Sequence, residues 1–114
     1  MIQPKYLGLF ADRESINQEF FPFKEGQQLT VPEEVLIAWY EYEYYSGQAV
    51  VLYRQDNKLY LVNGGHCSCN GLEGQWEPDE VTVPQLRMFL DKGTYFDQVK
   101  TEATEIIEAL ERGE

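Results

Sequence analysis

Basic residues are scarce in this sequence of 114 residues. Lysine and arginine together number 9, against 20 aspartate and glutamate residues, which gives a net charge of −11 and a pI near 4.4. Nucleic acids and anionic membranes are bound through basic side chains, so the composition argues against both partners. A strong negative charge keeps a small protein soluble, and it also suits a protein that competes for the basic groove of another protein. The sequence leaves these two roles of the charge open.

Long hydrophobic runs are absent as well. No segment approaches the ~20 apolar residues that a membrane-spanning helix requires. The first residues lack the hydrophobic region and cleavage site of a signal peptide. We therefore expect a cytoplasmic protein, and we expect its two cysteines, Cys67 and Cys69, to be reduced there.

Motifs that mark common enzyme active sites are also missing. The sequence contains no phosphate-binding loop, no dinucleotide-binding glycine pattern and no HExxH motif. Acidic residues occur between 73 and 80, but no spacing among them specifies a catalytic pair. Adjacent side chains on extended backbone point apart, so His66 is poorly placed to activate Cys67 as a nucleophile. The sequence therefore predicts a protein that is not an enzyme and has no catalytic residues.

The sequence does contain the pattern of one α+β domain over residues 1–114. Three segments rich in β-branched and aromatic residues predict consecutive strands: 35–45, 48–55 and 58–63. Short turns at Ser46-Gly47 and Asp56-Asn57 join them, which predicts an antiparallel meander. Tyr6 to Phe10 predicts a short edge strand, and Asp12 is the expected cap of a short helix over 13–20.

Two helices are predicted after this meander. Thr82 and Gln85 have the spacing of a capping box, Pro84 lies in the first turn, and Gly93 predicts the end of the helix. Asp97 is the expected cap of the second helix, whose apolar residues recur at helical spacing and must pack on the sheet. The predicted fold is an antiparallel meander sheet of three or four strands packed by two C-terminal helices.

The only histidine and both cysteines of the chain lie within four residues, His66 to Cys69. They fall in a glycine-rich segment, 64–81, which we expect to be a loop that starts where Gly64-Gly65 ends the sheet. Clustered imidazole and thiolate groups suggest a zinc site, and its candidate ligands are His66, Cys67 and Cys69. The alternative is that these side chains only order the loop and that no cofactor is bound. The lack of a fourth soft ligand favours this alternative.

Tyrosine and glutamate alternate along the first long strand. Because strand side chains alternate between faces, the tyrosines are predicted to share one face and the glutamates the other. Aromatic pairs across strands stabilise a sheet, and core packing accounts for much of this pattern. If the helices cover one face only, the other face presents tyrosines to a protein partner, because Tyr is enriched in interface hot spots. The candidate partner-binding residues are Tyr40, Tyr42, Tyr44, Trp76, Glu77, Glu105, Glu108 and Glu111.

The stretch from Glu34 to about Gly93 resembles an uncharacterised family of small bacteriophage and prophage proteins. The motifs that carry the resemblance are Gly65-His66-Cys67-Ser68-Cys69, Gly71-Leu72-Glu73, Gln75-Trp76 and Glu77-Pro78. The resemblance implies a phage-encoded protein that acts in the host cytoplasm, and it carries no assigned activity.

These observations together predict a small acidic accessory protein that acts by binding, and by inhibiting, a host protein. Anti-restriction and anti-CRISPR proteins are examples of this class. A small zinc-binding protein that uses the His66–Cys69 cluster is the alternative. Direct binding of nucleic acid or membrane is not expected, and a homo-oligomer is compatible with the sequence.

Overall fold

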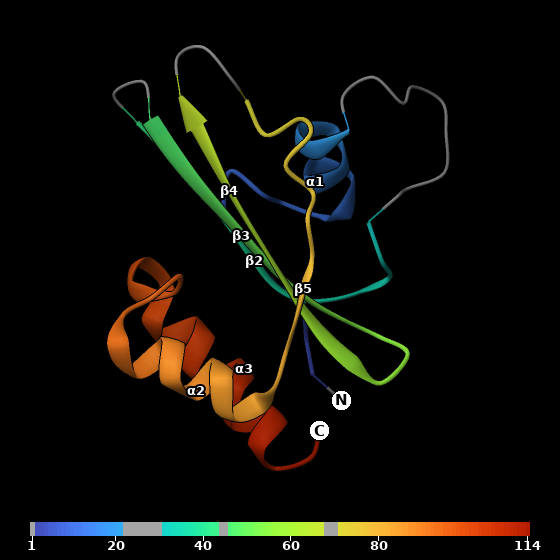
Figure 1. Ribbon diagram of the computed structural model, residues 1–114, viewed down its shortest axis with the longest axis vertical. Coiled ribbons are helices and arrows are strands. Elements are labelled where there is room, and N and C mark those ends of the chain that lie inside the picture. The colour runs from blue at the N-terminus through green and yellow to red at the C-terminus, as the bar shows by residue number, and fades with distance from the viewer. Residues whose placement is uncertain (1, 22–30, 44–45, 68–70) are drawn as a thin grey trace.

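A computed structural model describes residues 2–21, 31–43, 46–67 and 71–114, without the side chain of Cys67. It has an α+β fold in which a five-stranded sheet lies between helices on both of its faces (Figure 1). The elements in chain order are β1 (Lys5–Gly8), α1 (Arg13–Phe20), β2 (Glu34–Glu43), β3 (Ser46–Gln55), β4 (Lys58–Cys67), β5 (Asp79–Val81), α2 (Val83–Lys92), a 3-10 turn (Asp97–Val99) and α3 (Lys100–Glu111). None of the helices in these residues is long and apolar enough to cross a membrane.

The sheet has the strand order β1-β2-β3-β4-β5, so the predicted meander forms its centre. β2, β3 and β4 pair antiparallel, and the turn between β3 and β4 contains Asp56 and Asn57 with φ of 54° and 64°. Two consecutive residues with positive φ are typical of the tight hairpin turn that matches strand twist. The predicted edge strand is also present, and it runs parallel to β2. The prediction of an α+β fold with an antiparallel meander and two C-terminal helices is therefore confirmed.

β4 does not end at Gly64-Gly65, so the prediction of a loop from residue 64 to 81 was wrong. Gly64 and Gly65 pair in register with Ala49 and Gln48 of β3, and the strand continues to Cys67. A Cβ atom on Gly64 would lie 3.1 Å from a methyl group of Leu72. The glycine serves here to admit a packed side chain over the strand rather than to break the strand. His66 consequently lies within the sheet.

The helix ends follow the sequence with one exception. Asp12 caps α1 and Thr82 caps α2, each through a capping box, and Gly93 ends α2 in the left-handed conformation. Asp97 was predicted to cap the second C-terminal helix, but its side chain caps no helix. It begins the 3-10 turn, and α3 starts at Lys100 without a side-chain cap.

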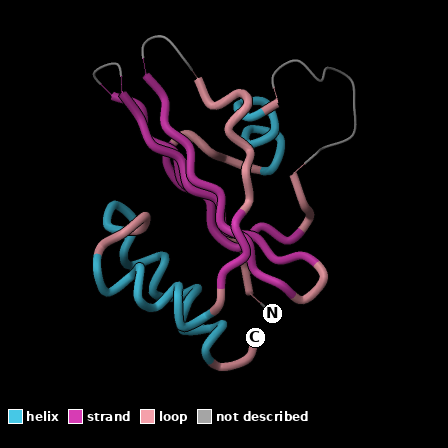
Figure 2. The backbone as a smooth tube through the Cα atoms, in the orientation of Figure 1, coloured by secondary structure: helices cyan, strands magenta, loops and turns pink. Residues whose placement is uncertain are grey.

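Each face of the sheet carries its own hydrophobic core. On one face α2 and α3 pack over a core that contains Trp39, Leu52 and Ile107. On the other face the core contains Tyr40 and Val51 of the sheet together with Phe20 of α1 and Leu72 of the segment before β5. Figure 2 shows α1 and this segment over that face. The second face is therefore covered where it crosses the middle of the sheet, and it is not the open tyrosine-rich surface that the sequence suggested.

Candidate interaction surface

The meander extends beyond both helical layers at one end, where β2 ends and β3 begins (Figures 1 and 2). We call this end the sheet tip, and define it as residues 41–43 of β2, 46–48 of β3 and 65–66 of β4, which are paired in register. Glu41, Tyr42, Glu43 and Gln48 are exposed there, and Tyr42 is one of three large hydrophobic side chains described as exposed, at 39%. The tip is the part of the sheet that the helices leave uncovered.

A glycine in the central strand brings two rings of the tip together. Tyr42 of β2 and His66 of β4 are both paired with Gly47 of β3, and their rings stack with centroids 4.1 Å apart at 19°. A Cβ atom on Gly47 would lie 2.4 Å from the carbonyl oxygen of Glu41 and 3.1 Å from the Tyr42 ring. Gly47 therefore leaves the room that the stack needs. The stack holds the exposed Tyr42 ring in one position on the surface.

Tyr40 lies deeper on the same face and supports His66 from below. Its hydroxyl group is hydrogen-bonded to Nδ1 of His66, and its ring is 2% exposed. Burial raises the pKa of Tyr40 to about 12, with smaller contributions from the nearby negative groups Glu19 and Glu73. Tyr40 therefore cannot contact a partner directly, contrary to its place among the predicted partner-binding residues. It positions His66 and, through the stack, Tyr42.

The raised pKa of Tyr40 predicts a loss of stability at high pH. The folded state favours the neutral phenol, so this contribution is complete below pH ~10 and is lost as the pH rises through about 12. This rise in the pKa of Tyr40 corresponds to at most about 3 kcal/mol of unfolding free energy. Urea unfolding of the wild type and of Tyr40→Phe, compared between pH 9 and pH 12, measures it. The wild type should lose more stability than the variant, and equal losses would contradict the assignment to Tyr40.

The remaining aromatic residues of this face form core contacts. Trp76 packs on the rings of Phe20, Phe21 and Tyr53 at centroid distances of 5.1–5.8 Å, and is half-buried. Its predicted role in partner binding is thus secondary to packing the segment before β5 onto the sheet. Glu77, the next residue, is exposed. Tyr44 lies outside the described residues.

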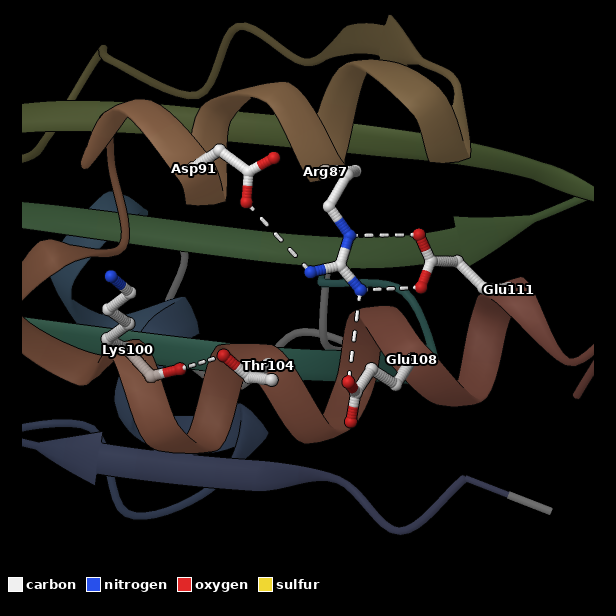
Figure 3. Close-up of polar contacts among 6 residues, drawn as sticks. All are labelled: Arg87, Asp91, Lys100, Thr104, Glu108 and Glu111. Carbon is white, nitrogen blue, oxygen red and sulfur yellow. Dashed lines mark hydrogen bonds and ion pairs between the residues drawn. The ribbon is translucent and has the colours of Figure 1, made fainter.

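Carboxylates on α3 that the sequence assigned to partner binding are engaged within the protein. Arg87 of α2 binds both oxygens of Glu111, at 2.6 and 3.0 Å, and lies 4.0 Å from Glu108 (Figure 3). This hydrogen bonding lowers the pKa of Glu111. Lys5 lies 2.7 Å from Glu105. Because cations of the same chain balance these charges, α3 contributes less to the negative field than its sequence suggests.

The carboxylates of the sheet tip are different. No ion pair within the described part of the chain involves Glu41 or Glu43. The longer sequence segments that include the tip residues, 25–53 and 59–86, contain no lysine or arginine. The basic residues of β3 and β4, Arg54 and Lys58, flank the turn at the opposite end of the sheet. The tip therefore carries negative charge that no cation among the described residues balances.

A shallow hollow lies beside these two carboxylates on the face that carries α2 and α3. It has a volume of about 450 Å³ and is lined by Trp39, Glu41, Glu43, Ser46, Gly47, Gln48 and Gln98. Two acidic side chains and two amide side chains are thus among the residues that line it. Such a lining favours a cationic group over an anion or an apolar group.

The zinc hypothesis receives no support from the described residues. Among them, no three His, Cys, Asp or Glu side chains lie close enough together to hold a metal ion. His66 is placed on β4 with Nδ1 engaged by Tyr40. The side chain of Cys67, together with Cys69, falls outside the described residues, so the hypothesis stays a prediction.

No protein-family model matches this chain, and comparisons with curated proteins and with solved structures also find no match. The resemblance to phage proteins therefore stays a prediction, and the proposed function rests on the surface of the structure alone.

Sequence reasoning identified Tyr42 but missed Gly47, which lies between the stacked rings. A glycine that pairs with a tyrosine on one side and a histidine on the other can indicate a stack of their two rings, once the strand pairing is known. Finding this pairing from the sequence requires both hairpins to be placed correctly, and the extension of β4 to His66 was not predicted.

Proposed function

We propose that this protein acts by binding a basic surface of another protein with its sheet tip, and that it catalyses no reaction itself. The observation that carries this proposal is the combination of Glu41 and Glu43, which have no ion-pair partner among the described residues, with an exposed Tyr42 ring stacked on His66. Aromatic anchors that are already ordered lose little conformational entropy on binding. The carboxylates beside the anchor supply attraction and orientation for a basic partner.

The charge distribution favours a basic partner over a second copy of this chain. A symmetric dimer through the tip would place Glu41 and Glu43 against the same residues of the other copy, and like charges across an interface are strongly unfavourable. A basic groove that normally binds nucleic acid has the complementary charge. On this proposal the partner is a host protein with such a groove, and occupying the groove inhibits it, as an anti-restriction or anti-CRISPR protein would.

Removing the two tip charges is expected to weaken partner binding about tenfold at low salt. The estimate takes about 0.5–1 kcal/mol for each exposed charge contact. The partner is first captured from bacterial lysate on the immobilised protein, identified and purified. Its Kd is then measured for the wild type and for Glu41→Gln/Glu43→Gln across a range of salt concentrations. The salt dependence of Kd should be shallower for the double variant.

Glu33→Gln/Asp56→Asn is the matched control, because it removes two exposed charges at the opposite end of the sheet. The control should bind the partner within about twofold of the wild type. Equal weakening in both double variants would show that only total charge matters. No weakening in the tip variant would reject the sheet tip as the binding surface.

A further inference from the structure

Among the described residues, no strand pairs with the outer edge of β2 at the sheet tip. β1 covers this edge as far as Tyr40, whose carbonyl oxygen accepts a hydrogen bond of 2.8 Å from the Leu9 N–H. In an antiparallel ladder alternate residues direct their backbone groups to the same edge. The N–H and C=O groups of Tyr42 therefore face the side that β1 has left. No backbone hydrogen bond within the described residues joins Tyr42 to a group on that side.

Gly8 explains why β1 leaves the edge at this point. Its φ is 67°, and a Cβ atom there would lie 2.3 Å from the Tyr40 carbonyl oxygen. The chain turns away at Gly8 and Leu9 towards α1, and Leu9 is left 58% exposed. An apolar side chain and an unpaired strand edge thus lie next to one another at the start of the tip.

The opposite edge of the tip is closed. Gly65 of β4 has its N–H and C=O bonded to the side-chain amide of Gln75, at 2.8 and 2.7 Å. This amide occupies the positions that the backbone of an added strand would take. β2 is therefore the edge of the tip at which a further strand can pair.

We propose that a basic, extended segment of the partner protein adds to the sheet as a strand beside β2, pairing with the backbone of Tyr42. This inference rests on the proposed function and specifies how the partner is held. Strand addition to an exposed edge is a common mode of peptide recognition, in which backbone hydrogen bonds give affinity and alternate side chains give specificity.

The two faces of β2 predict the side-chain pattern of the added strand. On the face of α2 and α3 the neighbours are Glu41 and Glu43, which border the 450 Å³ hollow and favour lysine or arginine. On the other face the neighbour is the Tyr42 ring, which favours an aliphatic or aromatic side chain. The segment should therefore alternate basic and apolar residues. The same carboxylates disfavour pairing of β2 with the acidic β2 of a second copy.

A short synthetic peptide of alternating lysine and valine tests the inference on the intact protein. Titration with this peptide should slow hydrogen exchange of the Tyr42 amide by at least about tenfold, because that amide becomes hydrogen-bonded. A control peptide with the same side chains, but with methylated nitrogens at its central residues, keeps the charge and loses the backbone donors. It should bind at least about tenfold more weakly. The backbone amide of Gly65, which is already hydrogen-bonded to the Gln75 side chain, is the internal reference, and its exchange rate should not change.

Equal binding of the two peptides, an unchanged Tyr42 amide in the bound state, or no binding of either peptide would overturn strand addition. The proposed function has a separate outcome, namely the salt dependence of partner binding in Glu41→Gln/Glu43→Gln. If that dependence changes as expected while Tyr42 gains no protection, the tip binds its partner through side chains alone. The proposed function then stands and this inference fails.

Discussion

Replacing Trp39 with alanine is expected to lower the free energy of unfolding by about 3–5 kcal/mol. Trp39 is 1% exposed and belongs to the core between the sheet and the two C-terminal helices. Its indole N–H donates a 3.0 Å hydrogen bond to the carbonyl oxygen of Tyr95, in the segment that joins α2 to the 3-10 turn. The substitution leaves a cavity and removes the only donor described for that carbonyl. Urea unfolding followed by circular dichroism measures the loss.

Two variants separate the causes of this effect. Trp39→Phe keeps most of the apolar volume but removes the N–H, and should cost about 1–3 kcal/mol. Trp76→Ala removes the second tryptophan, which is half-buried on the other face, and should cost less than Trp39→Ala. A cost for Trp39→Ala no larger than that for Trp76→Ala would contradict the role given to Trp39.

The parts of the fold that depend on local chemistry could be predicted from the sequence. Asp56-Asn57 tolerates the positive φ of a tight hairpin, and this turn set the register of β3 against β4. The caps at Asp12 and Thr82 marked two helix starts, because each side chain bonds a free N–H group within its own first turn. Such signals act over a few residues, and a single sequence contains them completely.

The errors arose where distant segments decide the local structure. Gly64 and Gly65 are strand breakers by propensity, but Gly64 is buried against Leu72 and Gly65 is held by the Gln75 amide. Pairing and packing outweigh the weak intrinsic preference of a strand glycine. The error about the second face has the same cause. That face is covered by α1, which precedes the meander in the chain, and by the segment before β5, which follows it.

The proposed binding surface overlaps the sequence prediction only in part, because Tyr42 was among the candidate residues and Glu41 and Glu43 were not. Composition indicated an acidic protein and left open whether its charge serves solubility or a basic partner. The sequence placed that charge on α3, where Glu108 and Glu111 are engaged by Arg87, and gave no binding role to Glu41 and Glu43. Carboxylates with and without a cationic partner look alike in a sequence. Only the tertiary fold brings Arg87 to α3 and Lys5 to Glu105, while no ion pair of Glu41 or Glu43 is found among the described residues.

Replacing Gly8 with alanine is expected to lower the free energy of unfolding by about 2–5 kcal/mol. A left-handed conformation costs about 1–2 kcal/mol for a residue with a Cβ atom. Steric overlap adds about 1–3 kcal/mol, because that atom would lie 2.3 Å from the Tyr40 carbonyl oxygen. β1 and β2 must move apart to relieve the overlap, so hydrogen exchange at Tyr6 and Leu7 should speed up together with the loss of stability measured in urea.

Gly74→Ala is the matched control for this prediction. Gly74 has a φ of 79°, but no atom outside its chain neighbours lies within 4 Å of a Cβ atom placed there. The control therefore includes the backbone strain and omits the overlap, and it should cost only about 1 kcal/mol. Equal costs at the two glycines would mean that β1 does not press against Tyr40. In that case the turn at Gly8 would not be what keeps the β2 edge open beside Tyr42, and strand addition at that edge would lose its structural cause.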